Sequence, residues 1–112
     1  MAFLTLSVVI PTHDTRELTL RCLGSVGYGG GPLAEGVVVD DAPSDGTADA
    51  VRARHPGVIG AATDGNIGFS RAVNLGAERA TGDILLVLNS DTEVGEGVLG
   101  ELAEAFFDDR TL

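Results

Sequence analysis

Leu4-Thr-Leu-Ser-Val-Val-Ile10 is an apolar, β-branched run that stops at the polar turn Pro11-Thr-His-Asp14. Strands that are buried on both faces of a parallel sheet read as near-continuous apolar runs of this kind, and they end at polar loops. No basic residue precedes the run and Pro11 closes it early, so neither a signal peptide nor a membrane span is supported. We therefore predict a buried parallel strand over residues 4–10.

Strand-like and helix-like segments alternate along the rest of the chain. Leu18, Cys22 and Val26 recur every four residues, which predicts an amphipathic helix over residues 17–26. The glycine-rich segment 27–32 is predicted to be a flexible connector, because it lacks the strand, glycine and helix order of a dinucleotide fingerprint. The further strands are predicted over residues 36–39, 58–62 and 83–88, and the further helices from a cap at Ser44 or Asp45 to about Arg54, from Asn66 to before Gly82, and around residues 99–106.

The helix that begins near Asn66 shows the clearest periodicity in the chain. Its predicted core face carries Phe69, Ala72, Val73, Gly76, Ala77 and Ala80. These positions follow the spacing of one helix face, and most of them are small, so we expect this helix to pack closely on a sheet. Asn66 stands where it could cap the helix or contact a ligand, and the sequence leaves both roles open.

Four strand-and-helix pairs predict an α/β fold in one domain over residues 1–112. We expect a Rossmann-like parallel sheet in the order 3-2-1-4, with right-handed crossovers and helices on both faces. In such sheets ligands bind beyond the carboxyl ends of the strands. Three polar segments follow strands here, at residues 11–14, 40–41 and 89–91, so the sequence predicts one crevice lined by three loops.

The charge balance restricts the class of partner. The 112-residue chain has seven basic residues, all arginine, against 17 acidic ones, which gives a net charge of −10. This balance argues against nucleic acid and anionic lipid as partners, and a bound nucleotide would need a metal ion. A single cysteine, Cys22, cannot form an internal disulfide, and no Cys/His spacing predicts a zinc site. A reducing cytoplasm is the simplest compartment.

Each candidate site residue also has a structural interpretation when it is considered alone. Asp40 and Asp41 suit a turn ahead of a helix, and Asp91 suits a helix cap. His13 is favoured as a loop histidine rather than a ligand or base, because no second histidine lies near it. Arg71 is favoured as a solvated helix residue. The functional interpretation therefore depends on the motifs taken together.

Taken in order, the motifs resemble the amino-terminal half of a family 2 glycosyltransferase with the GT-A fold. The resemblance covers essentially the whole chain, and the form of two motifs is most similar to the rhamnosyltransferase-like branch. The motifs are Val8-Val-Ile-Pro-Thr-His-Asp14, Val37-Val-Val-Asp-Asp-Ala-Pro-Ser-Asp-Gly-Thr47, Asn66-Ile-Gly-Phe-Ser-Arg-Ala-Val-Asn-Leu-Gly76, Ala80-Thr-Gly-Asp83 and Leu88-Asn-Ser-Asp-Thr92.

The resemblance implies a UDP- or dTDP-sugar donor held through Mg²⁺ or Mn²⁺. A carboxylate can accept the ring N–H of uracil or thymine, and these cations suit a few protein oxygens completed by phosphate and water. Asp91 is the implied metal ligand and Asn89 a weaker one, because the family has an aspartate there; Pro43 also stands where the family usually has serine. The implied nucleotide-binding residues are Pro11, Thr12, Asp14, Asp40, Asp41, Asn66, Gly68 and Arg71.

The same resemblance implies that residues needed for transfer lie beyond Leu112. The family inverts the sugar with a carboxylate base that activates an acceptor hydroxyl, and both that base and the surface for a glycan or lipid-linked acceptor are expected after the last segment. We therefore expect the fragment to be inactive alone, as part of an enzyme of cell-wall or polysaccharide synthesis that is cytoplasmic or peripheral at the inner membrane face. Uncovered apolar surface makes a homo-oligomer an expected arrangement.

Three other classes compete with this interpretation. The first is an inactive structural or oligomerisation module of the same fold. The second is a receiver domain, which is disfavoured because the chain has no lysine and its acidic pair follows the second predicted strand rather than the first. The third is a nucleotidyltransferase, which is disfavoured because the loop after the first strand has no basic residue before Arg16.

Overall fold

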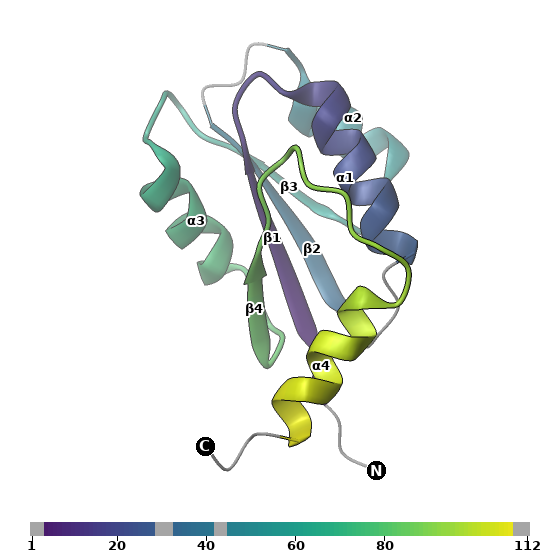
Figure 1. Ribbon diagram of the computed structural model, residues 1–112. Helices are drawn as coiled ribbons and strands as arrows, with labels where there is room; N and C mark the ends of the chain where they lie inside the picture. The colour runs from purple at the N-terminus through teal and green to yellow at the C-terminus, as the bar shows by residue number, and fades with distance from the viewer. Residues whose placement is uncertain (1–3, 29–32, 42–44, 109–112) are drawn as a thin grey trace.

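A computed structural model describes residues 4–28, 33–41 and 45–108. The described chain forms one four-stranded parallel sheet in the order β3-β2-β1-β4, as predicted (Figure 1). The strands are β1 (Leu6–Thr12), β2 (Leu33–Asp40), β3 (Ile59–Ala62) and β4 (Ile84–Val87), and the helices are α1 (Arg16–Tyr28), α2 (Thr47–Arg54), α3 (Phe69–Glu78) and α4 (Val98–Asp108).

The central strand β1 runs two residues further than predicted, through a proline. The carbonyl of Val9 accepts a hydrogen bond from the Leu88 amide at 2.9 Å, so Val9 and, two residues on, Pro11 both face β4. β4 ends at Val87, which is paired with Val9. Pro11 therefore has no partner strand on the side where its N–H is missing, and the strand continues without losing a ladder bond.

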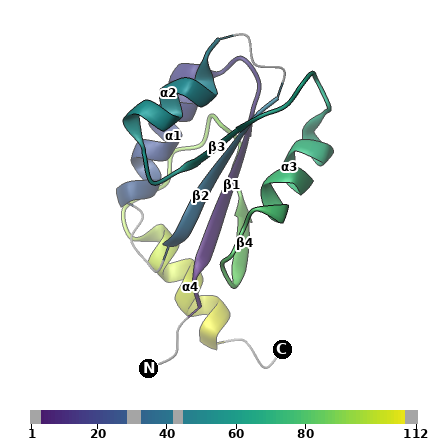
Figure 2. The ribbon, with the colours of Figure 1, turned by 180° about the vertical axis from the view of Figure 1, so that it is seen from behind.

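The sheet is covered unequally on its two faces. Helices α1, α2 and α4 pack on one face and α3 alone packs on the other, which Figure 2 shows from behind. The larger core contains Leu6, Val8, Ile10, Leu20, Cys22, Leu23, Val26, Val38, Ala50, Val51, Leu99 and Ala103. The smaller core contains Val9, Val37, Val39 and Ala72. Side chains of the valine-rich strands thus alternate between two buried layers.

Helix α3 differs from its prediction at its first turn. It begins at Phe69 behind the N-cap Gly68, so of the two roles left open for Asn66 the cap is excluded. Phe69 is 60% exposed, so its predicted place in the core is also wrong. The predicted close packing of the helix on the sheet is confirmed at Gly76, where a Cβ would lie only 2.5 Å from a methyl group of Val9.

At the amino ends of the strands, polar side chains hold the turn between α3 and β4. Glu35 accepts a hydrogen bond from the Thr81 amide at 2.8 Å and further bonds from the hydroxyls of Thr81 and Ser7. The Gly82 amide donates to the Ser7 hydroxyl at 2.7 Å. A Cβ on Gly82 would lie 2.7 Å from the Ser7 amide nitrogen. The Ala80-Thr-Gly-Asp83 motif thus joins β4 to β1 and β2.

Strand β4 borders the sheet in the described part of the chain and leaves apolar side chains exposed. Leu85 and Val87 are 45% and 36% exposed, whereas the alternate residues Ile84 and Leu86 pack against the larger core. Within the described ranges, no helix has the length and apolar character needed to cross a membrane.

Candidate functional site

A cleft with a volume of about 180 Å³ opens at the carboxyl ends of β1 and β2, beside α3. It brings together four of the predicted nucleotide-binding residues, from three separate segments. Its lining consists of Pro11, Thr12, His13, Asp41, Asn66, Phe69 and Ala72. The cleft is smaller than the roughly 300–1,000 Å³ that drug-sized ligands occupy, so it suits one ring-sized part of a larger ligand.

A chain of hydroxyl groups ties the end of β1 to the segment after β4. The buried Thr12 hydroxyl lies 2.6 Å from that of Thr15 and 2.8 Å from that of Thr19. The Thr15 hydroxyl in turn lies 2.8 Å from the hydroxyl of Ser90. Ser90 is the middle residue of the predicted metal-binding motif, so this motif lies beside the turn that lines the cleft.

The carboxylate of Asp41 is held by the segment before α3. It accepts hydrogen bonds from the Ile67 amide at 2.9 Å, the Gly68 amide at 3.0 Å and the Thr63 hydroxyl at 2.8 Å. Burial raises the pKa of this carboxyl, but these bonds, with Ile67 the strongest, outweigh it and leave the pKa below its ordinary value of 3.8. Asp41 is therefore an anion in the wall of the cleft.

Asp40 points away from the cleft lining and is fully buried. One carboxylate oxygen accepts a hydrogen bond from the Ala48 amide at 3.1 Å, which satisfies a free donor at the start of α2. The other oxygen has no hydrogen-bond partner among the described residues. Burial raises the pKa of Asp40, and the hydrogen bond from the Ala48 amide offsets only part of this effect.

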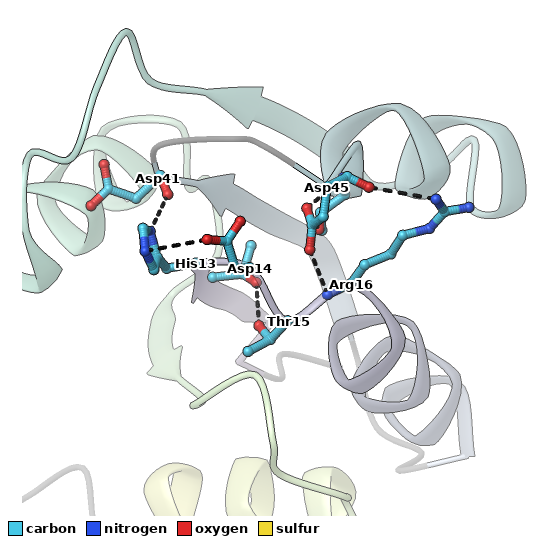
Figure 3. Close-up of polar contacts among 8 residues, drawn as sticks. His13, Asp14, Thr15, Arg16, Asp41 and Asp45 are labelled. Atoms are coloured by element: carbon cyan, nitrogen blue, oxygen red, sulfur yellow. Dashed lines mark hydrogen bonds and ion pairs between the residues drawn. The ribbon is translucent and has the colours of Figure 1, made fainter.

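His13 lines the cleft, although its sequence context favoured an ordinary loop residue. Its Nδ1–H donates to the carbonyl of Asp41 at 2.7 Å, and its Nε2 lies 3.6 Å from a carboxylate oxygen of Asp14 (Figure 3). The bond to the Asp41 carbonyl raises the pKa of His13, and the charge of Asp14 adds to this effect. Asp14 itself adopts a left-handed backbone conformation, with φ 52°, and does not line the cleft. Only folding brings Asp41 within reach of His13, so no sequence pattern marked this histidine.

Asp45 joins the starts of two helices on the other side of the turn. Its carboxylate accepts a hydrogen bond from the Arg16 amide at 3.0 Å (Figure 3). It also accepts one from the Thr47 amide at 3.1 Å. The hydroxyl of Thr47 also donates to it, and this bond leads the lowering of the Asp45 pKa. Asp45 thus contacts the start of α2, but the cap residue is Gly46 rather than Asp45, so the predicted cap is one residue off. Ser44 and Pro43 lie outside the described residues.

The predicted metal ligands lie on an exposed turn after β4. The Thr92 amide donates to the Asn89 carbonyl at 3.0 Å, which closes the turn, and the side chains of both Asn89 and Asp91 are accessible. Burial of Cys22 and then the charge of Asp91 raise the pKa of that thiol to about 11. The described residues contain no cluster of three or more Asp, Glu, His or Cys side chains that could hold a metal. Two oxygen-bearing side chains still fit Mg²⁺ or Mn²⁺, which often bind few protein ligands.

The remaining predicted residues, Gly68 and Arg71, are not in the cleft lining. Gly68 contributes its amide to Asp41 and has a φ of 89°, a conformation that favours glycine. Arg71 is exposed on the first turn of α3. Phe69, which sequence analysis placed in the core, lines the cleft instead.

Comparison with known proteins gives a family and a fold. Solved structures with a similar fold include residues 1–349 of S. aureus TarS, alone and in complex with UDP, each at 23% identity and a TM-score of 0.85 over 95% of this chain. A mannosyltransferase from Pyrobaculum calidifontis, in complex with GDP-Man and Mn²⁺, is 30% identical over 83% of this chain with a TM-score of 0.70.

The chain spans 33% of the TarS fragment and 29% of the mannosyltransferase. No curated protein sequence matches it significantly. The profile described as Glycosyl transferase family 2 matches residues 7–112. These findings agree with the motifs and the observed fold, and the chain belongs to glycosyl transferase family 2.

Proposed function

We propose that residues 1–112 form one domain that binds the nucleoside diphosphate of a sugar donor, with the base in the cleft and the diphosphate directed toward Asn89 and Asp91. The observation that carries the proposal is the hydroxyl chain from Thr12 through Thr15 to Ser90, at 2.6 and 2.8 Å. It joins the cleft to the exposed carboxylate turn along one edge of the sheet.

The cleft suits a heterocyclic base. The exposed ring of Phe69 offers an apolar surface on which a planar ring can stack. The side chain of Asn66 supplies both a donor and an acceptor, and the Nε2 of His13 is the ring nitrogen that does not bond the Asp41 carbonyl. We propose a UDP- or dTDP-sugar donor, in which the base N–H would meet the Asp41 carboxylate.

A divalent cation, Mg²⁺ or Mn²⁺, would be held by Asp91 with Asn89 as the weaker ligand. When bound, it neutralises the diphosphate that leaves as the sugar is transferred. The chain itself has a net charge of −10, which repels an anionic donor, so a cation also offsets the protein's own field. The solved complex of the Pyrobaculum mannosyltransferase with GDP-Man and Mn²⁺, and that of TarS with UDP, support this class of ligand.

We propose that the complete enzyme inverts the transferred sugar and delivers it to a glycan or lipid-linked acceptor. The base that deprotonates the acceptor hydroxyl would be a carboxylate outside residues 1–112, and these residues alone would bind donor without transferring sugar. A cytoplasmic or membrane-peripheral place in cell-wall or polysaccharide synthesis, and a rhamnosyltransferase-like donor, belong to the same proposal.

The proposal is tested by the melting temperature of the chain with UDP, with and without MnCl₂. We expect a rise only when both are present, because ligand that binds the folded state alone stabilises it by about 2.7 kcal/mol at a hundredfold excess over Kd. Asp91→Ala should abolish the rise, whereas Glu93→Ala, an exposed acid on the same segment, should retain it. No rise at millimolar UDP and Mn²⁺ would overturn the proposal.

In that case the alternative is a structural module, which the exposed Leu85 and Val87 on β4 favour. A module of this kind would self-associate through that strand. Its mass by light scattering would then rise with protein concentration, and Leu85→Glu would return it to a monomer. A constant monomer mass would exclude this alternative.

A further inference from the structure

We propose that Asp41 is a positioning residue, whose carboxylate holds segment 63–68 and the start of α3 so that Asn66 and Phe69 form one wall of the cleft. The inference rests on the proposed nucleotide site, since that wall is where the base would lie. In this role, Asp41 already holds the segment by hydrogen bonds in the protein without ligand.

The contacts of Asp41 converge on one short segment. Its two carboxylate oxygens accept from consecutive backbone amides, those of Ile67 and Gly68, at 2.9 and 3.0 Å. The Thr63 hydroxyl lies 2.8 Å from one of these oxygens and 2.6 Å from the Gly65 carbonyl, so its single hydrogen is shared. Asp41 is only 5% exposed, so these bonds are made largely out of water, where they are strongest.

The start of α3 has a particular need for such a partner. Gly68 is its N-cap and makes no side-chain cap bond, and the first turn has no acidic residue in the described helix. The first amides of a helix have no partner within the helix, and a negative charge beside them is stabilising. Asp41, directly after β2, places a negative charge beside this turn and accepts hydrogen bonds from the amide of the N-cap residue Gly68 and from that of Ile67 before it.

The wall residues are adjacent to the two amides that Asp41 holds. Asn66 directly precedes Ile67, and Phe69 directly follows Gly68, and both wall residues line the cleft. A carboxylate has about four lone-pair positions, and three donors already approach this one. About one position is left for a ligand, so most of what Asp41 contributes passes through the segment that it holds.

The test begins without nucleotide, by hydrogen exchange of the Ile67 and Gly68 amides measured by NMR. Asp41→Asn places an amide donor against a backbone donor, and we expect exchange of these amides to rise tenfold or more. The Leu88 amide, which bonds Val9 in the sheet, is the control for global unfolding and should change far less. Unchanged exchange at residues 67 and 68 in Asp41→Asn would overturn the proposal.

A second variant separates positioning from direct contact with the ligand. Thr63 does not line the cleft, yet Thr63→Val removes one of the three donors to Asp41. We expect Thr63→Val to weaken UDP binding in MnCl₂ about threefold to fivefold, and Thr63→Ser to restore it. If Thr63→Val binds UDP like the parent chain while Asp41→Asn does not, Asp41 acts by contact and the proposal fails.

Failure of the proposed function would look different. In that case the parent chain would not bind UDP at all, while exchange at residues 67 and 68 would still rise in Asp41→Asn. That result would support the positioning role of Asp41 and would reject only the proposal that the cleft binds a nucleotide.

Discussion

Glu35 and Asp40 lie near opposite ends of the same strand, β2, and their carboxylates differ in how many hydrogen bonds the protein gives them. At the amino ends, both oxygens of Glu35 are hydrogen-bonded, by Ser7 and Thr81, and these bonds outweigh burial and lower the pKa. At the carboxyl ends, Asp40 bonds the Ala48 amide through one oxygen only, and burial raises its pKa. Both oxygens of Glu35 thus have partners, whereas one oxygen of Asp40 has none among the described residues.

The two ends of the sheet also differ in whether an open cleft is present beside the polar groups. The amino ends use their polar groups to fix β4 against β1 and β2, so few of those groups are left for a ligand. At the carboxyl ends, His13 and Asn66 line an open cleft and Asp91 is exposed on a turn beside it. Ligands of open parallel sheets bind at the carboxyl ends of the strands, which is the end where this cleft lies.

The largest expected effect is at the amino ends. In Gly82→Ala the new methyl would meet the backbone of Ser7 at 2.7 Å and of Leu6 at 2.9 Å, and neither can move without shifting β1. We expect a loss of about 3 kcal/mol in the free energy of unfolding, measured with urea. Gly57→Ala, where a Cβ meets nothing within 4 Å, should change it by less than about 0.5 kcal/mol. If both substitutions lowered the free energy of unfolding equally, the close contact at Gly82 would not be the cause of the loss.

Glu35→Gln is the next test of the amino ends. The glutamine NH₂ group would face the N–H and O–H donors of Ser7 and Thr81, where the carboxylate accepts hydrogen bonds. We expect the free energy of unfolding to fall by about 2 kcal/mol at pH 7. Because folding lowers the Glu35 pKa below its ordinary value of 4.5, this stabilisation is present above pH 4.5 and lost as the pH falls through the folded value. The difference between parent and variant, followed by urea unfolding, should therefore shrink in acid. Glu78→Gln, on the exposed face of α3, is the control.

Of these substitutions, Asp40→Asn is expected to change the free energy of unfolding least. Its folded pKa lies above the ordinary value of 3.8, so its contribution is complete below pH 3.8 and is lost as the pH rises through the folded value. Asp40→Asn cannot ionise, and its oxygen can still accept from Ala48. We expect the variant at pH 7 to equal the parent or exceed it by about 1 kcal/mol. A loss of 2 kcal/mol or more would show that the charge itself is needed.

Much of this arrangement is predictable from the sequence. The order of strands and helices follows from hydrophobic spacing, and the strand order β3-β2-β1-β4 follows from that alternation together with the motifs. The location of the site also follows, because polar segments end three strands. Four predicted nucleotide-binding residues, Pro11, Thr12, Asp41 and Asn66, meet in the cleft.

The errors lie where a side chain's partner is distant in the sequence. Helical periodicity assigned Phe69 to the core, but the helix begins at this residue, and Phe69 lines the cleft instead. Asn66 suits a cap by residue type, yet Gly68 is the cap residue, and the distant Asp41 accepts the Gly68 amide. His13 had no nearby partner in the sequence and finds one in the Asp41 carbonyl.

The sequence by itself determined the parallel α/β sheet, its two cores and the end at which polar groups gather, because these depend on periodicity and on residue type along a strand. Only the tertiary structure decided what each polar group does there. Asp40 and Asp41 are neighbours in the sequence, and successive side chains of an extended chain point to opposite faces. One is buried beside α2 and the other holds the start of α3, and that division depends on which helix each face meets.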